Sequence, residues 1–199
     1  MRLPIRQYGD PILRAKGHRI SKIDDGIREL ATAMLETMHA ANGIGLAAQQ
    51  VGQALQLTVI DISETEDRPS TLKLNGTDVD VVSAMPLILL NPQVTLGPRT
   101  SRAVEGCLSF PDITGEIERS EFVVVHAETL EGEPMEMEAT GLLARALQHE
   151  ADHLNGILFI DRMSSAAKTS LASRLKRLQK ETRRSQGKDH LARIGQSAL

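Results

Sequence analysis

The chain contains few aromatic residues and a single cysteine, and each shortage excludes a class of protein. Aromatic residues make up 2% of the 199 residues, and tryptophan is absent. A stacking surface for single-stranded nucleic acid is therefore not expected, and the core must be aliphatic. Because Cys107 is alone, the chain cannot form an internal disulfide, which fits a reducing cytoplasm.

Long hydrophobic runs and an excess of positive charge are also missing. No apolar run reaches the roughly 18 residues of a transmembrane helix, and the first residues lack the hydrophobic segment of a signal peptide. We therefore expect a cytoplasmic protein with no membrane partner. The formal net charge is −3, so the chain as a whole is not basic, and we expect no sequence-specific DNA binding.

What the chain does contain is a predicted helix at residues 142–156 that carries two histidines. Its apolar residues recur near the helical period. His149 and His153 are four residues apart, so both imidazoles face one side of the helix and can reach one metal ion. Glu150 lies about 100° further round the helix, where it suits a general base beside the metal. The alternative is a surface helix that carries two histidines and two acids.

A catalytic metal site with an open position needs a third protein ligand. Cys107 is one candidate, although a lone cysteine is usually a small buried hydrophobic residue. The other histidines have no motif around them and are expected at the surface: His18, His39, His126 and His190.

Residues 42–52 form a second segment with functional signals, because two glycines flank Ile44 and small residues follow. Such a segment lets the backbone approach a ligand closely and adopt positive φ angles. A tight turn before a strand is the alternative, and a phosphate-binding loop is disfavoured because no Lys-Ser/Thr follows the glycines. Gln50 carries a neutral amide that can donate to a developing oxyanion.

The remaining elements predict further helices and strands. An amphipathic helix is expected at residues 26–41, and strands at residues 56–62, 86–92, 121–127 and 135–139, with Pro92 ending the second of these. Residues 63–85 are polar and predict a surface loop that can hold a short hairpin at Asn75-Gly76. We expect a short edge segment at residues 158–160 and another helix at residues 164–185.

Three segments together resemble the motifs of the peptide deformylase family. Residues 43–50 are similar to its Gly-x-Gly-x-Ala-Ala-x-Gln motif, residues 105–109 to Glu-Gly-Cys-Leu-Ser, and residues 149–153 to His-Glu-x-x-His. The order of the motifs is also the family's, and the resemblance extends from about residue 4 to about residue 180. Two departures are a longer connection at residues 63–85 and Thr114, where some relatives carry an arginine.

The resemblance implies an α+β fold, with antiparallel or mixed sheets packed around a central metal-binding helix. It also implies a C-terminal helix like that of bacterial members of the family. The catalytic part would be residues 1–163, and residues 164–199 would form a basic helix and tail. The implied activity is hydrolytic removal of the formyl group from N-formylmethionyl nascent peptides, with release of formate.

The resemblance also implies roles for individual residues. The metal ligands would be Cys107, His149 and His153, and the ion would be Fe(2+), although these ligands also suit Zn(2+), Ni(2+) or Co(2+) in purified protein. Glu150 would transfer the proton, and the oxyanion would be met by the Gln50 amide and the Leu108 N–H. The residues expected to bind the substrate are Ile44, Gly45, Gly106 and Leu142.

Two other readings of the histidine helix remain open at this stage. A metallopeptidase of the same motif usually takes a third histidine or a carboxylate as ligand, which Cys107 would replace. A structural zinc module is normally closed by a fourth protein ligand, and the chain has no second cysteine to supply it. Release of formate from formyl-Met-Ala-Ser, measured against cleavage of an unblocked peptide, distinguishes all three readings.

Two more expectations concern charged residues. Asp152 is expected to support the site by pairing with Arg119, with Arg102 as the alternative partner. Between Arg174 and Lys188 there are seven basic residues and one acid, Glu181. A basic helix on an acidic body suggests an anionic partner, and the resemblance indicates the ribosome. The alternative is a solvated helix whose charges only aid solubility.

Overall fold

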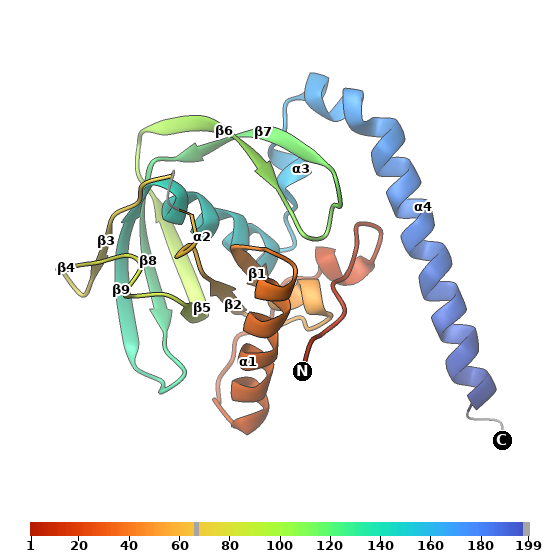
Figure 1. Cartoon of the computed structure of the whole chain (residues 1–199), viewed down its shortest axis with the longest axis horizontal. Helices are drawn as coiled ribbons and strands as arrows, with labels where there is room; N and C mark the ends of the chain where they lie inside the picture. The colour runs from red at the N-terminus through yellow and green to blue at the C-terminus, as the bar shows by residue number, and fades with distance from the viewer. Residues whose placement is uncertain (66–67, 197–199) are drawn as a thin grey trace.

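The computed structural model describes residues 1–65 and 68–196, with side chains as far as residue 186. In this part of the chain, seven strands form one antiparallel sheet in the order β1-β2-β5-β8-β9-β3-β4, and β6 and β7 form a separate hairpin (Figure 1). The strands are β1 Gly45–Ala47, β2 Leu57–Ile60, β3 Leu72–Leu74, β4 Thr77–Val79, β5 Leu87–Leu96, β6 Thr100–Gly106, β7 Thr114–Ser120, β8 Phe122–Glu128 and β9 Pro134–Thr140.

The helix α2, Gly141–Leu154, lies at the centre of the fold and confirms the predicted histidine helix. Leu143 and Leu147 of α2 are buried against the seven-stranded sheet, in one core cluster with residues of β2, β5, β8 and β9. The helix begins at Gly141, whose φ is +65° and whose Cβ, if present, would lie 2.0 Å from Pro69 O. Only glycine satisfies both conditions, so the start of α2 is fixed by the segment that precedes β3.

The helix α1, Asp25–Ala40, matches the predicted amphipathic helix and covers β1 and β2 (Figure 1). Asp24 caps it by accepting a hydrogen bond from Ile27 N, as expected for an N-cap aspartate. Met34 and Met38 are fully buried in this second cluster. Antiparallel sheets with helices packed on them give the α+β fold that the sequence predicted.

The structure corrects the prediction that Pro92 ends its strand. β5 continues to Leu96, with a bulge in its pairing to β8 between Leu90 and Gln93, where Asn91 has φ of +53°. Proline has no N–H for the ladder, and a bulge is one of the few places in a sheet where that loss is tolerated.

The prediction of a short edge segment at residues 158–160 is also wrong. The chain there turns into a one-turn helix, α3, Phe159–Arg162. The Asp161 side chain accepts a hydrogen bond from Leu158 N at 2.9 Å, which closes the turn locally.

The polar segment at residues 63–85 contains the predicted hairpin in its described part. β3 and β4 are joined by Asn75 and Gly76, which both have positive φ angles as the turn requires. β3 also pairs with β9, so this segment extends the large sheet.

The sequence did not predict the β6–β7 hairpin, because several of its buried side chains are charged or polar where a strand usually buries apolar ones. Most of its residues are polar, and its buried positions include Glu105, Arg119 and Ser120 as well as Ile117. Apolar alternation is the signal by which strands are recognised in a sequence, and here charged side chains point inward.

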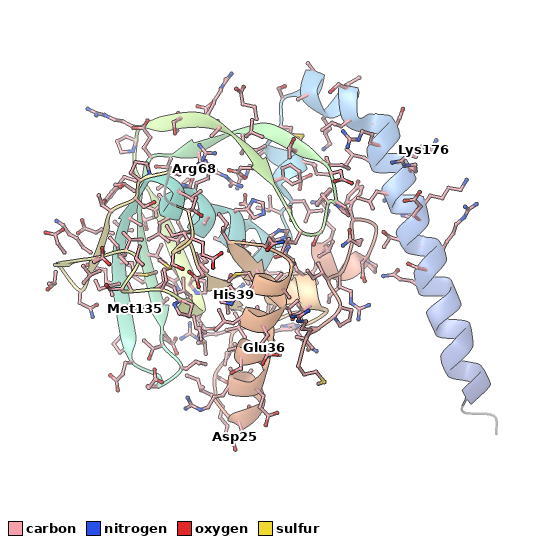
Figure 2. All side chains as sticks on the ribbon, viewed as in Figure 1. Asp25, Glu36, His39, Arg68, Met135 and Lys176 are labelled. Atoms are coloured by element: carbon pink, nitrogen blue, oxygen red, sulfur yellow. The ribbon has the colours of Figure 1, made fainter. Side chains whose placement is uncertain are left out.

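The last helix, α4, is longer than predicted and runs from Ser165 to Gln196 along one side of the molecule (Figure 1). Its first half packs on the body, where Leu175 is buried in a cluster with Phe110, Ile113 and Phe159. Its basic residues as far as Arg184 are exposed, and Lys176 points into solvent (Figure 2). No helix in the described residues is both long and apolar enough to cross a membrane.

Candidate metal centre

Three predicted metal ligands meet although they come from two elements. α2 supplies His149 and His153, and β6 leads directly into Cys107. One ligand atom of each residue lies within 4.8 Å of those of the other two, and Cys107 Sγ is 3.2 Å from His153 Nε2. The three side chains can therefore bind one ion.

The chemistry of these donors fits a divalent transition metal. A thiolate and two imidazoles are typical ligands of zinc and of related ions. Burial, followed by repulsion from His149 and Arg119, lowers the pKa of His153 well below its ordinary value. The ring is therefore neutral and keeps the lone pair that a metal ligand needs. His153 Nδ1 is also buried without a hydrogen-bond partner in the described residues.

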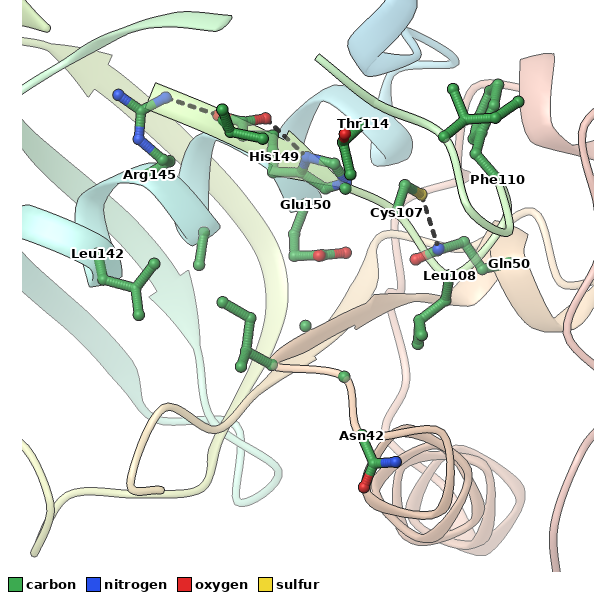
Figure 3. A pocket seen from close by; sticks show the side chains of 18 of the residues that line it. Asn42, Gln50, Cys107, Leu108, Phe110, Thr114, Leu142, Arg145, His149 and Glu150 are labelled. Carbon is green, nitrogen blue, oxygen red and sulfur yellow. Dashed lines mark hydrogen bonds and ion pairs between the residues drawn. The ribbon is translucent and has the colours of Figure 1, made fainter. Parts of the chain in front are cut away.

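Glu150 lies beside this group and is 4% exposed. Burial raises the pKa of Glu150 to about 7, so this carboxyl can exchange a proton near neutral pH. Its Oε2 is buried and has no hydrogen-bond partner among the described residues. Figure 3 shows Glu150, Cys107 and Gln50 around the same cavity.

The expected positive φ angles are absent from Gly43 and Gly45, and protein side chains lie close to both glycines. A Cβ on Gly45 would lie 2.3 Å from Glu150 Oε1, and a Cβ on Gly43 would lie 2.6 Å from Leu108 Cδ1. The residue with positive φ is Asn42, at +53°. The glycines therefore make room for Glu150 and Leu108, while the left-handed turn falls on the preceding asparagine.

Gln50 is 1% exposed and is held at both ends of its amide. Its Oε1 accepts a hydrogen bond from Ala47 N at 2.9 Å, so Nε2 faces the cysteine segment. This nitrogen lies 3.2 Å from Ser109 Oγ and 3.5 Å from Cys107 Sγ. Leu108 follows the cysteine directly, and its N–H donates to no group in the described residues.

A cavity of about 490 Å³ opens beside these residues. Its lining is mainly apolar and includes Phe110 and Ile113 as well as Thr114. The structure brings all four predicted substrate-binding residues to its wall: Ile44, Gly45, Gly106 and Leu142.

Sequence reasoning missed Glu105, which supports the first histidine. Its Oε2 is 3.0 Å from His149 Nδ1, and Arg119 donates to both of its oxygens. Burial opposes ionisation, but the hydrogen bonds from His149 and Arg119 outweigh it and lower the pKa of Glu105 to about 2. The residue was visible as the first position of the Glu-Gly-Cys-Leu-Ser segment, but that position had been given no role.

The predicted pairing of Asp152 with Arg119 is confirmed. Arg119 Nη1 donates to Asp152 Oδ2 at 2.5 Å, and the alternative, Arg102, pairs with Glu118 on the surface instead. The sequence had given no indication of Arg162 of α3, which donates to Asp152 Oδ1 at 2.6 Å.

The remaining histidines lie away from the site, as expected, where they are described. His18, His39 and His126 are exposed. The side chain of His190 lies outside the described residues.

A thiolate and two imidazoles that can bind a metal ion lie beside a buried carboxyl whose pKa is about 7. These are the groups that metal-dependent amide hydrolysis requires, and with this fold they define a metal-dependent hydrolase. The family described as polypeptide deformylase matches residues 2–169. The chain belongs to this family, whose members remove the N-formyl group from nascent peptides.

Individual relatives agree with this assignment. The peptide deformylase of Opitutus terrae is 43% identical over 92% of this chain and 96% of its own length. That of Methylacidiphilum infernorum is 43% identical over 90% of this chain and 94% of its own.

Solved structures agree as well. A plant peptide deformylase is 35% identical, with a TM-score of 0.80 over 93% of each chain. The enzyme from Thermotoga maritima is 38% identical, with a TM-score of 0.70 over 82% of this chain and 99% of its own.

Proposed function

We propose that Cys107, His149 and His153 hold one Fe(2+) ion and that Glu150 is the proton-transfer group of the deformylase reaction. The observation that carries the proposal is the Glu150 carboxyl, which is buried beside the three ligands with one oxygen unpaired among the described residues. When bound, the ion supplies a Lewis acid and makes hydroxide available near neutral pH.

Proton transfer and stabilisation of the formyl oxygen are assigned to groups of the protein itself. Glu150 takes a proton from the attacking water and later gives it to the leaving amine. The Gln50 amide and the Leu108 N–H donate to the formyl oxygen as negative charge develops on it. Gln50 suits this role because Ala47 fixes which end of its amide faces the site.

The lining of the cavity supports a substrate with an N-terminal methionine. Its apolar wall at Ile44 and Leu142 suits the methionine side chain. β1 is the first strand of the large sheet and pairs only with β2 among the described strands. The peptide backbone can therefore add as a strand beside Gly45, and Gly106 lines the same cavity.

Metal analysis combined with a formate assay tests this proposal. Protein purified anaerobically should contain about one iron per chain and release formate from formyl-Met-Ala-Ser. Cys107→Ser should lose the metal, since a hydroxyl is a poorer ligand than a thiolate for such ions. Unchanged metal content in this variant would show that Cys107 is only a packed side chain.

We further propose that α4 binds the ribosome through its exposed basic residues. Arg174, Lys176, Arg177, Lys180, Arg183 and Arg184 are all exposed. Changing Lys176, Lys180 and Arg183 to glutamine should weaken ribosome co-sedimentation at low salt and leave formyl-tripeptide turnover intact. The same change at Lys16, Lys22 and Arg28, which are exposed elsewhere, is the control. Equal ribosome binding by the wild type, the α4 variant and the control variant would rule the proposal out.

We infer from the same substrate that the protein works in the cytoplasm, where formylated nascent chains emerge. Residues 1–163 would carry the catalysis and residues 164–199 the ribosome contact. Cell fractionation tests the location, and the α4 substitutions above test the division of roles.

A further inference from the structure

A buried arginine joins the two elements that supply the metal ligands. Arg145 lies on α2, four residues before His149 and so on the same face of the helix. Its Nη1 donates to Glu105 Oε1 at 2.8 Å and to Ile117 O at 3.0 Å, and its Nη2 donates to Ser101 O at 2.9 Å. One side chain therefore ties α2 to both strands of the β6–β7 hairpin, which carries the cysteine ligand at its turn.

Arg145 also reaches the first histidine through one intermediate. Oε1 of the Glu105 carboxylate accepts hydrogen bonds from Arg145 and Arg119. Oε2 accepts one from Arg119 and lies 3.0 Å from His149 Nδ1. A bond to the second ring nitrogen fixes the orientation of a metal-binding histidine. Any shift of Glu105 is therefore passed to the His149 ring, and Figure 3 shows Arg145 and His149 on the same side of the cavity.

Arg145 supplies one of the two buried guanidinium groups that face the buried carboxylates of Glu105 and Asp152. The side chains of Glu105, Asp152, Arg119 and Arg145 are each at most 9% exposed, which gives two negative and two positive groups. Arg162, the further partner of Asp152, is 46% exposed. Without Arg145, two buried carboxylates would share one buried guanidinium, and an uncompensated buried charge is strongly unfavourable.

We propose that Arg145 is a positioning residue of the metal centre. It sets the separation between Cys107 and the histidines of α2, and it orients the His149 ring through Glu105. The inference rests on the metal ligation proposed above. It implies that Arg145 controls how firmly the ion is held as well as how fast substrate is turned over.

Cobalt-loaded protein provides a readout that is independent of activity. Arg145→Met keeps most of the side-chain length but removes the charge and all donors. We expect loss of cobalt to a chelator to become about 10- to 100-fold faster, with a changed visible absorption spectrum. Arg102→Met is the control, because Arg102 lies on the same hairpin and, among the described residues, pairs only with Glu118 at the surface. Its dissociation rate and spectrum should match those of the wild type.

Two further variants show whether Arg145 acts through Glu105. Arg145→Lys restores the charge but not the planar fork, so it should fall between Arg145→Met and the wild type. Combining Arg145→Met with Glu105→Gln should lose cobalt little faster than the worse single variant, because both changes break the same chain of contacts.

A folded Arg145→Met protein with the wild-type dissociation rate and spectrum would overturn the inference. If Arg145→Met does not fold, Arg145→Gln, which keeps a single donor group, is judged by the same criterion. Failure of the wild-type protein to bind cobalt at these residues would instead overturn the proposed ligand set.

Discussion

At the scale of single residues, the position of Glu150 depends on a neighbour without a side chain. Gly45 lets the Glu150 carboxylate approach β1, where any Cβ would overlap its Oε1. The same carboxyl is buried in a way that raises its pKa to about 7. One glycine thus connects the edge strand proposed to bind the peptide with the group proposed to move the proton.

Glu150→Gln tests this role directly. The amide has nearly the same shape but cannot transfer a proton, so kcat should fall about 10²- to 10⁴-fold. Metal content should stay near that of the wild type, because Glu150 is outside the three-ligand group. Formate release and metal analysis on the same preparation provide the two measurements. Near-normal turnover would exclude Glu150 as the proton-transfer group.

Glu105 gives a prediction for the pH dependence of stability. Its pKa is lowered to about 2 in the folded protein, from 4.5 for an unperturbed group. Its stabilising contribution is therefore complete above pH 4.5 and is lost as pH falls toward 2. The stability difference between wild type and Glu105→Gln should narrow by about 2 kcal/mol between pH 5 and pH 3. Urea unfolding of chelator-treated proteins measures it, and a constant difference would contradict the lowered pKa.

At the scale of elements, α4 has one face on the body and one in solvent. Leu175 packs on the cluster around Phe110 and Ile113, and Arg174 donates to Asp112 O in the loop that lines the cavity. The other basic residues as far as Arg184 lie on the exposed face. The helix is therefore part of the folded core at its start, and a deletion from residue 174 onward would remove packing as well as charge.

Two substitutions at neighbouring residues test the packed face and the exposed face of α4 separately. Leu175→Ala should lower the free energy of unfolding by about 2–5 kcal/mol, because it leaves a cavity in the cluster. Lys176→Ala should change it by less than about 0.5 kcal/mol. Denaturant unfolding measures both values. Equal effects would mean that α4 is not packed through Leu175.

The elements also show which features were predictable from the sequence. α1, α2 and the turn at Asn75-Gly76 follow local rules of periodicity, capping and turn chemistry, and each was predicted. The β6–β7 hairpin was not, because its inward side chains include Glu105 and Arg119, whose burial makes sense only beside α2. Likewise, the ligands could be found from their motifs, but their charged supports, Arg145 and Arg162, depend on contacts between distant segments.

At the scale of the whole molecule, removal of the metal should weaken the protein without unfolding it. α2 is held by an apolar core with the sheet that includes none of the three ligands. A metal present at 100 times its dissociation constant contributes about 2.7 kcal/mol. Chelation should therefore lower Tm by about 5–10 °C in a protein of this size, with the far-ultraviolet circular dichroism unchanged. Loss of that signal on chelation would show that the metal is needed for the fold itself.

The placement of the ligands along the chain also sets an order of events during synthesis. Cys107 and His153 are 46 residues apart, and the β7, β8 and β9 strands lie between them. The ribosome therefore exposes the thiol well before it has made the helix that carries the histidines. A growing chain has no complete set of donors until α2 has emerged and packed. Under the proposed ligation, the ion can therefore be bound by all three ligands only after α2 has emerged and packed.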